Sequence, residues 1–157
     1  EVLYNTNEGH RKIAVALQEM WKDYLNIDIK LLNQEWKVYL ATESAGDYQI
    51  SRGGWIGDYV DPNNFLDMFL CGGGNNRTGW CNEEYDRLIL EVAPSQSSHE
   101  ERLAVFQQAE TMLLDDMPII PVYTYTSVKL VDSSVENLDG NIMNQAMYKD
   151  IYLSPRQ

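Results

Sequence analysis

The first 32 residues, EVLYNTNEGHRKIAVALQEMWKDYLNIDIKLL (residues 1–32), decide the fold class. Apolar residues at positions 13, 17, 20, 21 and 24 recur with the period of an α-helix and predict a helix over residues 8–25. A short apolar strand that ends at residues 4–6 precedes it. The alternation of apolar and charged residues over 27–31 predicts a half-buried strand behind it. Strand, helix and strand in so short a stretch form a βαβ unit with parallel strands.

The rest of the chain contains signals for further helices and short strands. Helices are predicted over about 36–43, from the cap and proline Asp61-Pro62, from Asn82 to Pro94, and from a capping box at Ser98 to about residue 116. Strands are predicted over 48–52, 119–126 and 128–131. Pro121 indicates that the second of these lies at a sheet edge or crosses elsewhere. The prediction is an α/β fold with a small mixed sheet flanked by helices.

Composition and charge exclude several classes of function. The chain has 157 residues and a formal net charge of −12, which argues against nucleic acid and anionic membranes as partners, because both require clustered Lys and Arg. Its apolar runs are too short for insertion into a membrane. The two histidines, His10 and His99, lack a second ligand at metal-site spacing, so neither a metal nor a cofactor is expected. The many acids of residues 82–116 predict a solvated face.

The segment RGGWIGDY (residues 52–59) is the strongest candidate for a ligand site. It follows a predicted strand, and ligands of α/β sheets commonly bind at the carboxyl ends of strands. Trp55 offers a flat face, and Asp58 offers a charge-assisted partner for an ammonium group. Trp55 as a core residue is the alternative. Asp61 has a structural role available as a helix cap, whereas Asp58 has none.

Two further pairs of residues leave alternatives open. Cys71 and Cys81 lie in a Gly/Asn-rich segment, which favours a local disulfide and an oxidising compartment over two unrelated thiols. Tyr123 and Tyr125 alternate to one face of a predicted strand, where they form either core or a pocket wall.

Five blocks of the sequence are specific when they are taken together. They are, in order, NQEWK (residues 33–37), GWxxDYxDPxxFL (54–66), NxxYD (82–86), AE (109–110) and IIPVYxY (119–125). These blocks resemble those of one family, the oligopeptide/dipeptide-binding proteins of ABC importers (extracellular solute-binding proteins, family 5), and they occur in family order over most of the chain. The resemblance implies the C-terminal lobe of a two-lobe fold of the periplasmic-binding-protein type, class II. It assigns residues 1–118 to that lobe and residues 119–157 to crossing strands and a tail that pack toward the other lobe.

The resemblance also implies roles for four residues. Asp58 matches the acid that pairs with the α-ammonium group of a peptide, and Trp55 lies in the same wall. Arg52 matches a basic residue that can bind the peptide carboxylate in some members of the family. Tyr125 matches an aromatic residue of the binding pocket. The family gives no rule for a Cys71–Cys81 bond, but its extracytoplasmic location supports an oxidising compartment.

The function implied is that of a non-enzymatic, periplasmic or otherwise extracytoplasmic receptor, with or without a lipid anchor. It would bind oligopeptides and deliver them to the permease subunits of an importer. The strand-like start at Glu1, without an initiator Met, leads us to expect a part of a longer protein. Two alternatives remain open at this point. One is a glycosidase that uses two carboxylates beside Trp55, and the other is an acidic lobe for protein interaction.

Overall fold

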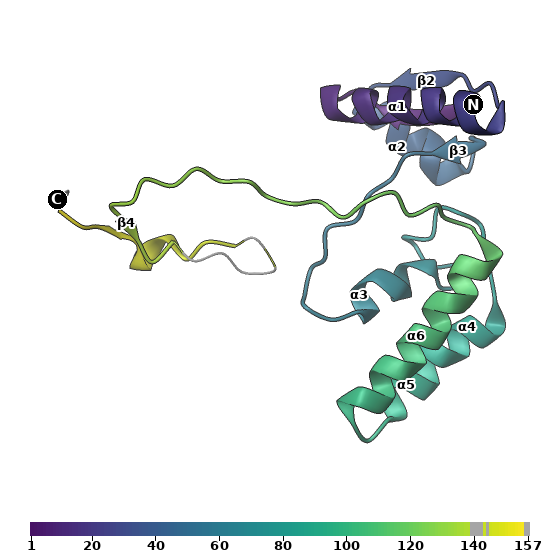
Figure 1. The fold of residues 1–157 in the computed structure, drawn as a ribbon. Coiled ribbons are helices and arrows are strands. Elements are labelled where there is room, and N and C mark those ends of the chain that lie inside the picture. Colours follow the sequence, from purple (N-terminus) through teal and green to yellow (C-terminus); the bar gives the residue numbers. More distant parts are fainter. Residues whose placement is uncertain (139–142, 144, 156–157) are drawn as a thin grey trace. The chain divides into compact units, whose positions relative to one another are not determined.

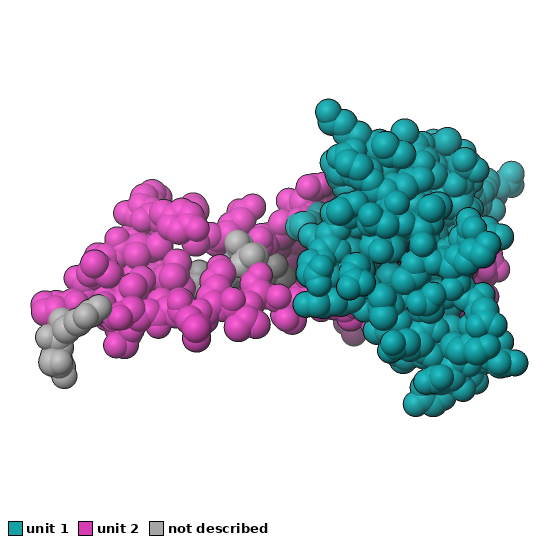
Figure 2. All heavy atoms as spheres, turned by 90° about the horizontal axis from the view of Figure 1, so that it is seen from above, with its two compact units in different colours: residues 1–56, 68–86 teal, residues 57–67, 87–157 magenta. Residues whose placement is uncertain are grey.

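The computed structural model describes residues 1–138, 143 and 145–155, so parts of the predicted tail lie outside the described residues. Figure 1 shows the elements in chain order. The chain divides into two compact units, residues 1–56 with 68–86 and residues 57–67 with 87–157 (Figure 2). In this division the segment 57–67 belongs to the same unit as the last long helix, and the assignment of residues 1–118 to one lobe stays a prediction.

Unit 1 contains a three-stranded parallel sheet with the order β2-β1-β3. Its elements are β1 (Val2–Asn5), α1 (Glu8–Leu25), β2 (Leu31–Gln34), α2 (Trp36–Ala45) and β3 (Ile50–Ser51). All four residues of the central strand β1 are buried, and both α1 and α2 pack against it. The predicted βαβ unit and its parallel pairing are confirmed.

Capping residues determine where α1 begins and ends. The Asn7 side chain accepts hydrogen bonds from the first-turn amides of Gly9 and His10, at 2.8 and 3.2 Å. At the other end Asn26 adopts the left-handed conformation, with φ 54°. The predicted helix over residues 8–25 is therefore confirmed.

The strand predicted over residues 27–31 is wrong in its position. The amide of Ile27 still bonds to the carbonyl of Trp21 at 3.1 Å, so the chain has only just left the helix. Pairing begins where the Val2 amide donates to the Lys30 carbonyl at 2.8 Å, and β2 then runs over Leu31–Gln34. Alternation alone did not reveal the residues needed to turn from the helix onto the sheet.

A loop closed by the disulfide Cys71–Cys81 also belongs to unit 1, and the Cα atoms of the two cysteines are 4.6 Å apart. The side-chain amide of Asn76 lies at its centre and donates to the carbonyls of Phe69, Leu70 and Trp80 at 2.9–3.1 Å. The loop leads into α4, for which the Asn82 side chain accepts the first-turn amides, as predicted.

Unit 2 is mainly helical. It contains the π-helical η2 (Leu88–Val92) and α5 (Ala93–Ser95), which ends one residue beyond Pro94. These elements continue directly from α4 (Glu83–Arg87), of which residues 83–86 belong to unit 1. Helix α6 (His99–Asp116) begins at the predicted capping box of Ser98 and Glu101. The short α3 (Asn63–Leu66) packs against α6, and η1 (Asp67–Phe69) follows it. The buried residues of η2, α5 and α6 form the core: Leu88, Ile89, Ala93, Phe106, Ala109 and Leu113.

The two strands predicted over 119–126 and 128–131 are wrong, because residues 117–132 form neither helix nor strand here. From residue 120 to residue 132 the chain is exposed, with Val128 at 90% and Leu130 fully accessible. An extended segment becomes a strand only with a ladder partner, and none of the described strands pairs with it. Beyond it, β4 (Val135–Glu136) and β5 (Tyr152–Leu153) form a small antiparallel pair that the sequence did not predict, and η3 (Tyr148–Asp150) lies between them.

An ion pair joins α6 to the turn before α3. The guanidinium of Arg102 binds both carboxylate oxygens of Asp61, at 2.6 and 2.8 Å, and also lies 4.5 Å from the centre of the Phe106 ring. Asp61 additionally caps the turn by accepting the Asn63 amide at 2.9 Å. Arg102 lowers the pKa of Asp61 from its ordinary value, chiefly through these hydrogen bonds.

We expect Asp61→Asn to lower the free energy of unfolding by about 1–2 kcal/mol at pH 7, because the pair is bidentate and only about a quarter exposed. The folded pKa is the lower one, so this stabilisation is complete above the unfolded pKa and is lost as the pH falls through the folded pKa. Urea unfolding of both proteins at pH 7 and pH 3 measures the effect. Lys12→Gln, which breaks the exposed Glu8–Lys12 pair, serves as the control and should cost less than about 0.5 kcal/mol. Equal losses for both variants would contradict the prediction.

Candidate functional site

The carboxyl edge of the sheet in unit 1 carries a group of polar residues. Strands β1, β2 and β3 end there at Asn5, Gln34 and Ser51. Asn5 is buried, and the Oε1 atom of Gln34 is buried without a hydrogen-bond partner. Thr6 bridges two of the strand ends by donating to the side-chain oxygen of Asn33 at 2.9 Å. Polar groups at this edge of a parallel sheet are suited to binding a ligand.

His10 adds a titratable group to this edge. It lies in the first turn of α1, and its Nδ1 is 2.8 Å from Oδ1 of Asn5. Burial, followed by the positive charge of Arg52, lowers the pKa of His10 and so favours the neutral ring. Sequence reasoning considered His10 only as a metal ligand. The cap at Asn7, directly after a strand, was the signal that could have placed it at the edge.

Arg52 and Trp55, two of the predicted site residues, follow β3 at the same edge. Both are half-buried. The Arg52 amide donates to the carbonyl of Leu3 at 2.8 Å, so the ladder between β1 and β3 continues to this residue. Gly53 and Gly54 come next and leave the sheet. The structure therefore places an arginine and an indole within four residues, where the chain departs from the strand.

Asp58 and Tyr125, the other two predicted residues, belong to unit 2. Asp58 is exposed, and its backbone amide donates to Oδ1 of the buried Asn64 at 3.2 Å, which holds the backbone at this residue. Tyr125 is 54% exposed and contacts Tyr123 edge to face, with ring centres 4.8 Å apart. The four predicted residues are thus split between the units, two in each.

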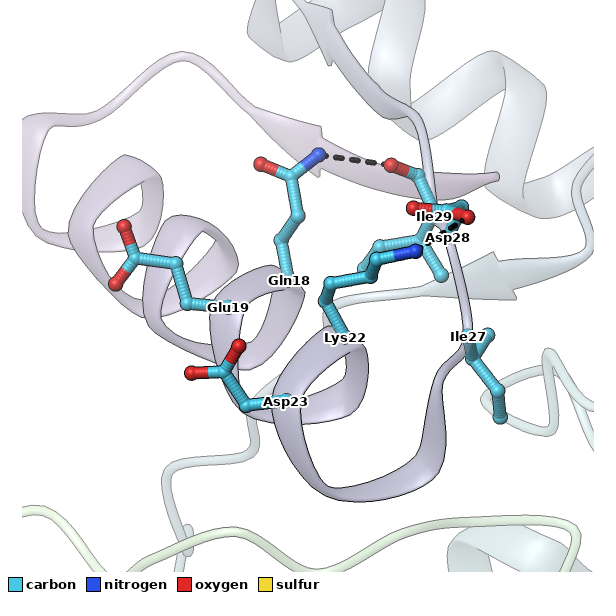
Figure 3. A pocket seen from close by; sticks show the side chains of 7 residues that line it. All are labelled: Gln18, Glu19, Lys22, Asp23, Ile27, Asp28 and Ile29. Atoms are coloured by element: carbon cyan, nitrogen blue, oxygen red, sulfur yellow. Dashed lines mark hydrogen bonds and ion pairs between the residues drawn. The ribbon is translucent and has the colours of Figure 1, made fainter.

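Neither of the two described cavities contains a predicted site residue. The smaller, about 350 Å³, lies between α1 and the segment before β2, and Figure 3 shows its charged lining with Lys22 paired to Asp28 at 2.9 Å. The larger, about 590 Å³, is lined by Glu1, Lys30 and residues 46–49. Both are formed by residues that precede strands. They therefore lie at the amino edge of the sheet, opposite to the edge where such folds bind ligands.

The described residues show neither a metal site nor a membrane span. Within residues 1–138, 143 and 145–155, no three His, Cys, Asp or Glu side chains are grouped to hold a metal ion. Among the helices of the same part of the chain, none is both long and apolar enough to cross a bilayer.

Comparison with protein families relates the chain to one family. Residues 1–77 match the model of the bacterial extracellular solute-binding proteins, family 5, middle part. The oligopeptide-binding protein OppA of Bacillus subtilis (strain 168) is 45% identical over 141 residues, which are 89% of this chain and 25% of OppA. The dipeptide-binding protein DppE of the same organism is 42% identical over 135 residues, which are 86% of this chain and 25% of DppE.

Solved structures agree with the sequence relatives. The Escherichia coli murein tripeptide binding protein MppA superposes with a TM-score of 0.84 at 34% identity, over 99% of this chain and 30% of that one. Haemophilus influenzae OppA, in complex with the peptide RPPGFSPFR, superposes with a TM-score of 0.83 at 35% identity, over 97% of this chain and 30% of that one. The chain thus has the α/β fold of part of these proteins and spans about a quarter of the length of the curated relatives it matches.

Proposed function

We propose that this chain is part of a peptide receptor of an ABC importer. Residues 1–77 belong to the family 5 bacterial extracellular solute-binding proteins, and the later residues align with the same relatives. The receptor binds oligopeptides outside the cytoplasm and delivers them to the permease subunits in the membrane. It carries out no reaction of its own. The observation that carries the proposal is the match over nearly the whole chain to a relative solved with a bound peptide.

The site residues suit the two ends of a peptide. Asp58 supplies a carboxylate for the α-ammonium group, and Arg52 supplies a guanidinium for the α-carboxylate. Trp55 and Tyr125 supply flat walls for the chain between the ends. A receptor that recognises the ends and the backbone tolerates many side chains, as a peptide importer requires.

We further propose that residues 119–157 leave the lobe formed by residues 1–118 and pair with another part of the receptor. Residues 120–132 support this, since they are exposed and belong to no described strand, while their alternating β-branched and aromatic residues have high strand propensity.

We expect Asp58→Asn in the complete receptor to weaken peptide binding at least about tenfold. A charge-assisted hydrogen bond in a closed site contributes about 1.5–3 kcal/mol, and the stranded ammonium group adds to the loss. Titration calorimetry with tri-alanine measures the effect. Asp23→Asn is the matched control, because it makes the same charge change at the amino edge of the sheet and should leave the affinity unaltered.

N-acetylated tri-alanine distinguishes loss of the proposed contact from a general loss of peptide binding. Acetylation removes the ammonium charge, so the wild-type receptor should lose affinity while Asp58→Asn and the wild type should bind this ligand equally. Unchanged binding of unmodified tri-alanine by Asp58→Asn would refute the assignment of Asp58.

A further inference from the structure

Tyr39 has its hydroxyl group at the junction between α2 and the end of β3. The residue is 4% exposed, although it lies on a helix whose neighbouring side chains are mostly accessible. Its hydroxyl oxygen is 2.6 Å from Oε1 of Glu43, 3.0 Å from the carbonyl oxygen of Arg52 and 3.2 Å from Oγ of Ser51. Ser51 also donates to Oε1 of Glu43 at 3.2 Å. A buried tyrosine hydroxyl with three hydrogen-bonding neighbours is held in one position and links the groups around it.

The hydroxyl remains a hydrogen-bond donor over the whole physiological pH range. Burial, followed by the carboxylate of Glu43, raises the pKa of Tyr39 to about 12. Both the carboxylate and the Arg52 carbonyl are acceptors, and they share the single phenolic proton. Replacing Tyr39 by Phe removes this donor while it keeps the ring and its packing.

The backbone of Arg52 is held from two sides. Its amide donates to the Leu3 carbonyl at 2.8 Å, on the β1 side, and its carbonyl accepts from Tyr39, on the α2 side. The next two residues are Gly53 and Gly54, which restrict the backbone least of all residues. The Tyr39 hydroxyl and the Leu3 carbonyl thus hold the backbone of Arg52 directly before these two glycines, at the point where the chain leaves the sheet.

We propose that Tyr39 is a positioning residue for peptide recognition, which holds Arg52 in the orientation that meets the α-carboxylate of the ligand. Tyr39 itself touches no ligand in this proposal. The inference rests on the proposed function, and it adds a residue of α2 for which neither the sequence patterns nor the relatives assigned a role. Glu43 and Ser51 support the hydroxyl by completing its hydrogen bonds.

The test compares two ligands, tri-alanine and its C-terminal amide, which lacks the negative charge that Arg52 recognises. In the complete receptor, Tyr39→Phe should weaken binding of tri-alanine about three- to tenfold, the range expected for one net hydrogen bond. Binding of the amide should stay within a factor of about two, since it makes no use of the guanidinium. A merely structural role would weaken binding of both ligands equally, and that result would overturn the proposal.

A variant cycle with Arg52→Gln identifies the route of the effect. On the Arg52→Gln background Tyr39→Phe should cause no further loss, because the group that it positions is gone. Tyr48→Phe is the matched control. It removes another half-buried phenolic donor of unit 1, which binds the Arg77 carbonyl, and should leave the affinities for both ligands unchanged. A further loss on the Arg52→Gln background would overturn the proposal.

Failure of this inference and failure of the proposed function give different results. If Arg52→Gln alone leaves the ratio of the two affinities unchanged, Arg52 does not read the carboxylate and the role of Tyr39 is refuted, while tri-alanine binding still supports a peptide receptor. If the wild-type receptor binds neither ligand, the proposed function itself is refuted. Amide exchange at Gly53 and Gly54 adds a readout that does not depend on a ligand, and unaltered exchange in Tyr39→Phe would also overturn the proposal.

Discussion

Loss of the bond between Cys71 and Cys81 should lower the free energy of unfolding of this chain by about 2.5–3 kcal/mol. The bond closes a loop of about ten residues, and the chain-entropy model gives this value for the restriction of the unfolded state. The double variant Cys71→Ser/Cys81→Ser, compared with the wild type by urea unfolding, measures the loss. Reductant should produce a similar loss in the wild type. It should produce no loss in the double variant, which has no disulfide to reduce and therefore controls for other effects of the reductant.

The effect should be concentrated in the loop and the start of α4. The Cys71 amide donates to both carboxylate oxygens of Asp86, at 3.1 and 3.2 Å, so the loop is tied to the helix it precedes. Trp80 packs edge to face on the buried Tyr85, with ring centres 4.9 Å apart, and its near-ultraviolet dichroism reports on the loop. Two freely alkylated thiols in non-reduced protein from an oxidising compartment would contradict the prediction.

Helices whose ends are set by local side chains could be predicted from the sequence with their boundaries. Helix α6 begins where Ser98 and Glu101 exchange hydrogen bonds, and this pattern needs only four consecutive residues. Helix α1 combines an apolar stripe with a cap at each end. The parallel arrangement of β1 and β2 could also be predicted, because a helical crossover between two neighbouring strands dictates it. In these cases the interactions that determine the structure lie within one short segment of the sequence.

Strands were predicted less well, because a strand depends on a partner that is distant in the sequence. Residues 27–31 alternate, yet they turn the chain from α1 onto the sheet, and hydrogen bonding to β1 begins only at Lys30 and Leu31. Residues 119–131 have the composition of strands, but no described strand forms a ladder with them. Strand propensity without a ladder does not produce a strand.

The same difference between local patterns and contacts made only in the fold applies to the candidate site. Trp55 and Asp58 could be proposed as site residues because a glycine-rich strand end marks them in the sequence. His10 and Tyr39 were missed, since they reach the carboxyl edge only through the fold, from the first turn of α1 and from one side of α2. A residue that acts through a backbone carbonyl, as we propose for Tyr39, leaves no motif at all.

This chain alone should fold but bind tri-alanine with a dissociation constant above about 1 mM, at least a thousandfold weaker than a receptor with micromolar affinity. The relatives are three to four times longer, and we propose that the remainder supplies the other wall of the site. Without that wall Asp58 faces water, and Tyr125 is 54% exposed. An ion pair between exposed groups contributes only about 0–1 kcal/mol, compared with a much larger contribution in a dehydrated site.

Two measurements on the 157-residue chain examine this expectation. Thermal unfolding should be cooperative, because both units have buried cores and capped helices, whereas amides of residues 119–131 should exchange first, since no ladder protects them. Calorimetry with tri-alanine should show no saturable binding below about 1 mM, in contrast to the complete receptor. Micromolar binding by the isolated chain would mean that residues 1–157 already contain a complete, dehydrated site. The proposed division of the peptide site between this chain and the rest of the receptor would then be wrong, because no second wall would be needed to strengthen the contact with Asp58.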